Sequence, residues 1–201
     1  MPGSVRRAGY ADGRQTQISG YYNPIPTGES QTGWVYVVAN NFDRSGPVVL
    51  YRATPQSFTD RSSWQGWAAG PGGGWNQPPT PLWPDRVGEM NIREIDGKAV
   101  LSYFNASTGN MEVRVAYDPT GLGTAPATTV VRAGEWPDPV ESLPPPEDNR
   151  LAQPYGGYIS PGSTLDEVRV FVSQWNTAPR DRTPYRVIQF AVNPFKPWSE
   201  P

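Results

Sequence analysis

Three segments of the chain repeat one pattern. Each has an aliphatic and aromatic strand ending near Asn, a turn of Gly, Ser, Pro or Asp, and a second β-branched strand. The segments are residues 34–53, 98–116 and 168–192, so their starts are about 64 and 70 residues apart. Shorter candidate strands precede and follow these units, at 17–25, 64–70, 89–95, 128–134 and 155–160. Alternation of apolar and polar side chains is the period of a half-buried strand, so the pattern predicts β-sheets.

A four-stranded antiparallel unit repeated along a chain is typical of propeller blades. The prediction is therefore an all-β chain: a β-propeller of four-stranded antiparallel blades, with about three blades in residues 17–195. Residues 1–16 and 196–201 are expected to be tails. An ordinary β-sandwich, which also has strand pairs between turns, is the alternative. No segment predicts a helix, because the 24 Pro and 21 Gly residues interrupt most windows of a dozen residues.

Three blades do not close a ring, since propellers usually have roughly four to eight. We therefore expect a piece of a larger propeller, or a ring whose other blades come from another chain. Either arrangement leaves blade faces and edges open when the chain is alone. Open edges and apolar faces favour association, so self-association through these edges is expected.

The composition excludes several function classes. The chain has no Cys and no His, which excludes disulfides, cysteine nucleophiles, Ser-His-Asp triads and zinc sites of the usual kind. The net charge is −2, so no basic field exists to attract nucleic acid. The longest apolar stretch, Trp34–Ala39, is too short to span a membrane, and residues 1–15 lack the apolar segment of a signal peptide. No nucleotide-binding or metal-binding motif occurs, so no cofactor and no metal are expected.

Paired carboxylates are the leading catalytic option that remains, and two carboxylates suffice for glycoside hydrolysis. Trp and Tyr rings flanked by Asn and Gln suit a sugar, through ring contacts and hydrogen bonds to hydroxyls. In a propeller such a ligand lies at one mouth of the central channel, near the first two strands of each blade. The candidate substrate-binding residues are Glu89, Asn91, Tyr103, Asn105, Tyr155, Gln174, Trp175 and Asn176. The first unit offers Tyr21, Tyr22, Asn23, Asn40 and Asn41.

Glu89 is the one candidate for a catalytic acid or base, because it directly follows a Gly at a strand start. The alternative is that Glu89 is a solvated or salt-bridged carboxylate. The Asn residues at strand ends equally suit a turn, because Asn tolerates left-handed and Asx-turn geometry. For the Trp-rich segment 64–83, packing of a connection is favoured over a glycan-stacking lip. The Pro-rich segment 137–154 is expected to be an extended, solvated connection without a catalytic role.

Three segments of the sequence resemble a known protein family. They are RVGEMNIREIDGKAVLSYFNASTGNMEVRVAYDPTG, YGGYISPGSTLDEVRVFVSQWN and GWVYVVANNFDRSGPVVLYRATPQSFTD, and the similarity covers roughly residues 17–195. They resemble the domain-of-unknown-function family 4185 of actinobacteria, reclassified as glycoside hydrolase family 183.

The resemblance implies a five-bladed β-propeller with endo-D-arabinanase activity on the arabinan of arabinogalactan and lipoarabinomannan. It also implies a secreted or cell-envelope location, and a pair of working aspartates in the early blades. The expected strand ending in Gly-Asp has no counterpart in this sequence, so no catalytic aspartate is assigned. The functional hypothesis is a glycoside hydrolase-like domain that contributes the arabinan-binding wall. The alternative is a non-catalytic carbohydrate-binding or scaffolding propeller.

Overall fold

A computed structural model describes residues 17–136, 149–175 and 185–196. These residues form thirteen strands and two short 3-10 helices, with no α-helix among them. The first sheet has its strands in chain order: β1 (Gln17–Asn23), β2 (Trp34–Asn40), β3 (Val49–Ala53), β4 (Gln65–Ala68) and β5 (Gly74–Trp75). The 3-10 helix η1 (Arg61–Ser63) lies between β3 and β4, where the Asp60 side chain caps it.

The second sheet also keeps its strands in chain order. It contains β6 (Val87–Ile95), β7 (Lys98–Asn105), β8 (Asn110–Ala116), β9 (Ala127–Gly134) and β10 (Arg150–Ala152). The third sheet contains β11 (Pro154–Ile159), β12 (Val168–Gln174) and β13 (Arg186–Val192). The second 3-10 helix, η2 (Pro119–Gly123), joins β8 to β9. All pairings are antiparallel except that of β10 with β9, which is parallel.

The all-β prediction is confirmed, and each predicted strand segment contains an observed strand. The number of strands in each sheet differs from the expected four. Among the described residues, the first two sheets have five strands each and the third has three. The difference in the second sheet arises in the Pro-rich segment 137–154. Its last part forms β10, in which Leu151 and Ala152 are buried, so this part is not the solvated connection that was expected. Residues 137–148 lie outside the described part of the chain.

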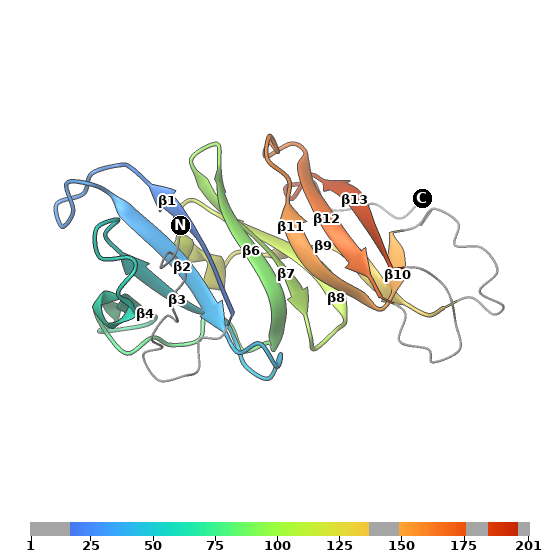
Figure 1. Cartoon of the computed structure of the whole chain (residues 1–201), viewed down its shortest axis with the longest axis horizontal. Coiled ribbons are helices and arrows are strands. Elements are labelled where there is room, and N and C mark those ends of the chain that lie inside the picture. The colour runs from blue at the N-terminus through green and yellow to red at the C-terminus, as the bar shows by residue number, and fades with distance from the viewer. Residues whose placement is uncertain (1–16, 137–148, 176–184, 197–201) are drawn as a thin grey trace, which may run out of the picture.

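The three sheets stand side by side in chain order along the long axis of the molecule, as Figure 1 shows. One apolar core lies between the first and second sheets and contains Val38, Leu50, Ile92 and Leu101. Another lies between the second and third sheets, around Met111 and strand β12. The second sheet is therefore buried on both faces, unlike a sheet in a two-sheet sandwich around one core.

The first strands of the three sheets are neighbours: β1 contacts β6, and β6 contacts β11. Two side chains tie them together. Ser19 Oγ of β1 accepts a hydrogen bond from the Ile92 N–H of β6 at 3.0 Å, and Asn91 Oδ1 accepts one from the Ile159 N–H of β11 at 3.0 Å. Asn91 Nδ2 also lies 3.3 Å from Ser19 Oγ. The inner strands of successive sheets thus approach one another, as the first strands of blades do.

The Trp residues of segment 64–83 are packing groups. Trp83 is buried with its ring 5.1 Å from the Tyr103 ring, and the Arg114 guanidinium lies 4.5 Å from it. Trp67 and Trp75 pack together at 5.1 Å, and Trp64 stacks on Phe58 at 5.6 Å. The favoured interpretation of this segment, packing rather than a glycan-stacking lip, therefore agrees with the structure.

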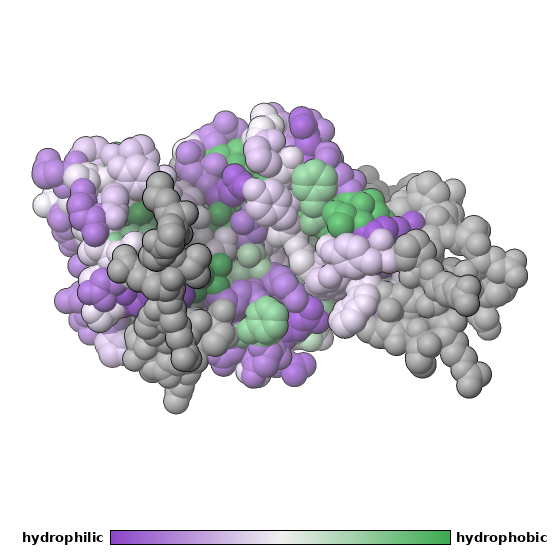
Figure 2. Space-filling model, viewed as in Figure 1, coloured by the Kyte–Doolittle hydropathy of each residue, from purple (hydrophilic) through white to green (hydrophobic). Residues whose placement is uncertain are grey.

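The face seen in Figure 2 is mostly hydrophilic over the first two sheets, and hydrophobic residues appear there as separate small patches. Within the described residues, no helix is long and apolar enough to cross a membrane.

Candidate functional site

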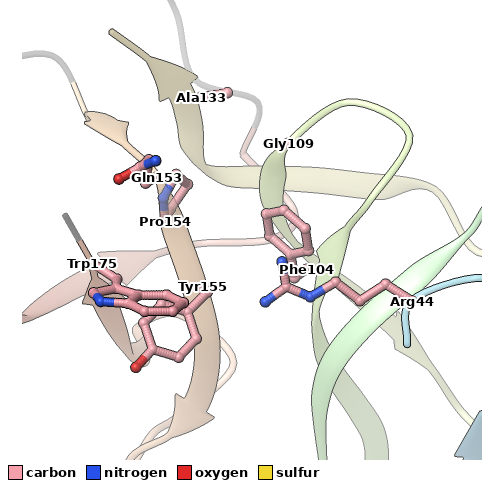
Figure 3. A pocket seen from close by; sticks show the side chains of 8 residues that line it. All are labelled: Arg44, Phe104, Gly109, Ala133, Gln153, Pro154, Tyr155 and Trp175. Atoms are coloured by element: carbon pink, nitrogen blue, oxygen red, sulfur yellow. The ribbon is translucent and has the colours of Figure 1, made fainter. Parts of the chain in front are cut away.

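A cavity of about 340 Å³ lies where the ends of the three sheets meet, and we call it the mouth cavity. The loop after β2 contributes Arg44. The second sheet contributes residues from β7, from the β7–β8 turn and from β9, and the third contributes the start of β11 and the end of β12. Figure 3 shows the lining residues: Arg44, Phe104, Gly109, Ala133, Gln153, Pro154, Tyr155 and Trp175.

One wall of the mouth cavity is aromatic. In the β11–β12 pairing Tyr155 faces Ser173, so Trp175, just beyond β12, comes to lie near Tyr155. The two ring centroids are 6.2 Å apart, and the Tyr185 ring lies edge-on to Tyr155 at 6.0 Å. The side chains of Tyr155 and Trp175 lie next to each other in Figure 3. Trp175 is 56% exposed, so this wall offers a large ring face to a ligand.

The opposite wall is charged and apolar. Arg44 Nη2 donates to Glu89 Oε1 at 2.5 Å, and the Arg44 guanidinium carbon lies 4.7 Å from the centroid of the Phe104 ring. The arginine therefore joins the first sheet to both β6 and β7 of the second. Because Glu89 balances the charge of Arg44, this wall has little net charge. The second carboxylate oxygen of Glu89, Oε2, is buried and has no hydrogen-bond partner among the described residues.

Gly88 allows Arg44 and Phe104 to approach β6. A Cβ atom at this position would lie 2.8 Å from Phe104 Cδ1 and 3.1 Å from Arg44 Nε. We expect Gly88→Ala to displace both side chains and to lower the free energy of unfolding by about 1–3 kcal/mol, the usual cost of overpacking. Urea denaturation measures this cost.

Gly28→Ala is the matched control for Gly88→Ala, because a Cβ atom at Gly28 would meet nothing within 4 Å. We expect this control to leave the unfolding midpoint unchanged. Equal midpoints for the two variants would show that the close packing around Gly88 does not stabilise the mouth cavity.

The Tyr155 hydroxyl belongs to a short hydrogen-bonded chain. Tyr155 is hydrogen-bonded to Tyr185, and Tyr185 donates to Ser173 Oγ at 2.8 Å. The hydrogen bond with Tyr185 and, to a smaller extent, desolvation raise the pKa of Tyr155 to about 12. Tyr155 therefore stays a neutral hydrogen-bond donor throughout the physiological pH range.

The raised pKa of Tyr155 predicts at which pH this side chain ionises in the folded chain. A tyrosine in an unfolded chain ionises near pH 10. In the folded chain Tyr155 is expected to ionise near pH 12 instead, while the hydrogen bonds of its partner Tyr185 to Ser173 and Tyr155 lower the pKa of Tyr185. Tyr185→Phe removes the main cause of the shift, so we expect the pKa of Tyr155 to fall toward 10. Phenolate absorbance measures it, with Tyr155→Phe identifying the signal. An unchanged titration in Tyr185→Phe would contradict this assignment.

Two predicted site residues, Tyr103 and Asn105, lie in a buried network next to the mouth cavity. The Tyr103 hydroxyl donates to Glu112 Oε2 at 2.6 Å, and Asn105 Nδ2 lies 3.2 Å from both Glu112 oxygens. Asn105 Nδ2 also lies 3.3 Å from Asp85 Oδ2. Tyr103 is fully buried, and desolvation together with Glu112 raises its pKa. In this structure these side chains support the end of β7 and do not line the cavity.

Other predicted residues are placed differently. Gln174 is buried: its Nε2 donates to the Ala152 carbonyl at 2.9 Å, and its Oε1 accepts from Arg186 Nε at 2.6 Å. Asn91 ties the inner strands, as described above. Asn176 lies outside the described residues. Among the predicted residues, Tyr155 and Trp175 line the mouth cavity, and Glu89 lies beside it, paired with the lining residue Arg44.

Sequence reasoning missed Arg44, Phe104 and Gln153. Arg44 lies in a loop and has a left-handed backbone with a φ of 61°, a conformation that nothing in the local sequence indicates. Phe104 had a usable signal, because it alternates with Tyr103 and Asn105 and so faces the other side of β7. Within the described part of the chain, no group of three or more acidic residues is placed to hold a metal ion.

The sequence is similar to a family model and to several known proteins. A family model described as domain of unknown function DUF4185 matches residues 4–191. A Mycolicibacterium smegmatis protein, described as an uncharacterized 35.9 kDa protein in the asd 3′ region, is 74% identical over 98% of this chain. The notoamide biosynthesis cluster protein J′ of Aspergillus versicolor is 34% identical over 75% of the chain. The matched regions span 59% and 39% of those two proteins.

Two solved structures are also similar. One, a "putative hydrolase" from Bacteroides ovatus, has a TM-score of 0.52 at 14% identity over 81% of this chain and 42% of its own. This likeness shows a shared fold. The other is the α-L-arabinanase of Penicillium chrysogenum complexed with arabinobiose, with a TM-score of 0.33 at 16% identity over 79% of this chain and 58% of its own.

Proposed function

The chain belongs to the DUF4185 family, and we propose that it is a glycoside hydrolase-like domain whose mouth cavity binds D-arabinan of cell walls. The proposal includes a secreted or cell-envelope location, where this polysaccharide occurs. The matched relatives are longer than this chain, which spans 59% of the M. smegmatis protein. Hydrolase activity of a protein of that full length is therefore proposed as well.

The observation that carries the proposal is the pairing of two unlike walls in one cavity. The aromatic wall of Tyr155 and Trp175 suits the C–H face of a sugar ring. The Arg44–Glu89 wall suits hydroxyl groups, because guanidinium N–H groups donate while the charge of the pair is balanced. A cavity of about 340 Å³ lies within the size range of small-molecule sites. A neutral, hydroxyl-rich ligand fits both walls.

The acid–base step is assigned to none of the residues that the structure describes. Glycoside hydrolysis requires two carboxyl groups placed about 5–10 Å apart across the scissile bond. Glu89 adjoins the mouth cavity, but Arg44 holds it in an ion pair, and Asp85 and Glu112 are hydrogen-bonded to Asn105. This observation favours a second candidate function, which is carbohydrate binding without hydrolysis.

One experiment separates the two candidates. Purified chain is incubated with mycobacterial arabinogalactan, and the released oligosaccharides are measured by chromatography, while binding of D-arabinan oligosaccharides is measured by calorimetry. Release indicates a hydrolase, and binding without release indicates a carbohydrate-binding domain. L-arabinan and dextran are the polysaccharide controls. Absence of both binding and release would contradict the proposed function.

A further inference from the structure

Strand β13 has one edge that no strand of the described residues covers. It is the last strand of the third sheet and pairs with β12 on its other edge (Figure 1). In the first two sheets the corresponding third strand is covered by a fourth antiparallel strand, which is β4 or β9. The outer edge of β13 therefore presents a row of backbone N–H and C=O groups that can pair with another strand.

The other strands at the ends of the sheets are short or already in contact. At the outer ends of the first two sheets, β5 has two residues and β10 has three. At the inner ends, β1 contacts β6, and β6 contacts β11. Strand β13 has seven residues, Arg186–Val192. It is therefore the long open edge of the part of the chain that the structure describes.

Strand β13 lacks the features by which edge strands usually avoid pairing. Such strands carry charged side chains, a proline or a bulge. Residues 187–192 include no charged residue and no proline. The seven residues of β13 pair one for one with β12, whereas the pairings β6–β7, β8–β9 and β11–β12 each contain a register shift. The open edge is therefore regular and almost uncharged, which favours the addition of a strand.

The two faces of β13 differ in burial. Ile188 and Phe190 are half-buried and pack against the core between the second and third sheets. Val187, Gln189 and Ala191 are exposed on the opposite face. A strand added to this edge with apolar side chains beside Ile188 and Phe190 would cover more of the same core.

We propose that the open edge of β13 binds the same edge of a second copy of this chain, in antiparallel orientation about a two-fold axis at Gln189. In this register all seven residues pair, with Arg186 opposite Val192 of the second copy and Ile188 opposite Phe190 of the second copy. No like charges face each other, and apolar side chains meet across the contact.

This register makes β13 its own complement, and for that reason a second copy is the partner. The contact is isologous, so it closes at two copies and uses the open edge of both. The inference goes beyond the proposed function and does not depend on glycan binding.

Disulfide capture tests this register, because the chain has no Cys of its own. Residues directly opposite in antiparallel strands have Cβ atoms about 4.5–5.5 Å apart, close to the roughly 3.5–4.5 Å of a disulfide. We expect Gln189→Cys to form a disulfide-linked dimer under mild oxidation, since residue 189 faces residue 189 of the second copy. Non-reducing electrophoresis measures the rate of dimer formation.

Val187→Cys and Ala191→Cys are the matched controls, because both positions are exposed on the same face as Gln189. Position 187 lies opposite position 191 of the second copy, and each lies about 13 Å along the strand from its own counterpart. Either variant alone should form the dimer at least tenfold more slowly than Gln189→Cys, and their equimolar mixture should match it. The pairing is overturned if neither Gln189→Cys nor the mixture forms the dimer, or if either control alone reacts as fast as Gln189→Cys.

Light scattering measures the reversible association of the unsubstituted chain. We expect the mass to rise with concentration from 22.1 kDa toward twice that value. Gln189→Lys places like charges directly opposite each other, so it should weaken the dimer about fivefold, and mixing it with Gln189→Glu should restore the dimer. Tyr117→Lys, at an 86% exposed position outside β13, should leave association unchanged. A mass that stays at that of one chain up to millimolar concentration would overturn the proposal.

Discussion

Trp175→Ala is expected to weaken the binding of D-arabinan oligosaccharides by roughly 10- to 100-fold, the usual effect of removing a central aromatic group from a binding site. Trp175 offers the largest exposed ring of the mouth cavity, and Tyr155 lies beside it. Its removal leaves one wall without the surface on which a sugar ring packs. Calorimetric titration with D-arabinan oligosaccharides measures the change.

Two variants control the Trp175→Ala measurement. Trp175→Phe keeps an aromatic ring and should lose less affinity than Trp175→Ala. Trp64→Ala removes a tryptophan that stacks on Phe58, away from the residues of the mouth cavity, and should leave affinity unchanged. Equal affinities of Trp175→Ala and the unsubstituted chain would show that the aromatic wall does not bind the glycan.

Glu112→Ala is expected to lower the free energy of unfolding by about 3–5 kcal/mol, because hydrogen bonds to a charged group contribute about 1.5–3 kcal/mol each and the substitution removes those from Tyr103 and Asn105. Glu112 is 7% exposed and accepts hydrogen bonds from Tyr103 and Asn105, while Arg114 Nε lies 3.0 Å from the Tyr103 hydroxyl. The substitution leaves the buried Tyr103 hydroxyl without its acceptor, and Asn105 Nδ2 keeps only Asp85 Oδ2 at 3.3 Å. Urea denaturation with a linear extrapolation measures the loss.

Glu112→Gln separates the loss of hydrogen bonds from the loss of volume. The glutamine carbonyl oxygen still accepts one hydrogen bond in nearly the same volume, so we expect a smaller loss of about 1–2 kcal/mol. A loss below about 1 kcal/mol in Glu112→Ala would contradict the view that this network stabilises the end of β7.

The strands could be predicted because alternation is a local property. Strand β12 shows this well: Val168, Val170 and Val172 are buried toward the second sheet, as their spacing indicates. Strand β10 could not be predicted, because its burial depends on the parallel pairing of Leu151 with Ala133 of β9. Prolines around it favoured a solvated connection, and only the tertiary structure shows otherwise.

The mouth cavity could be predicted only in part. Tyr155 and Trp175 could be predicted because they lie at the start and end of strands. Glu89 could be predicted because it directly follows Gly88 at a strand start. Arg44 could not be predicted, because its approach to Glu89 depends on how the first two sheets pack. Tyr103 was assigned to the substrate from its position at a strand end, but its face of β7 packs toward the first sheet in the buried core.

The most direct test of the account is the indole N–H signal of Trp175 in a ¹⁵N–¹H correlation spectrum during titration with D-arabinan oligosaccharides. Trp175→Phe assigns the signal among the eight tryptophans of the chain. Trp83, which is 6% exposed in the core, is an internal reference. We expect the Trp175 signal to shift and saturate while the Trp83 signal stays in place. Saturable shifts at other tryptophans with an unchanged Trp175 signal, or no shift at all, would contradict it.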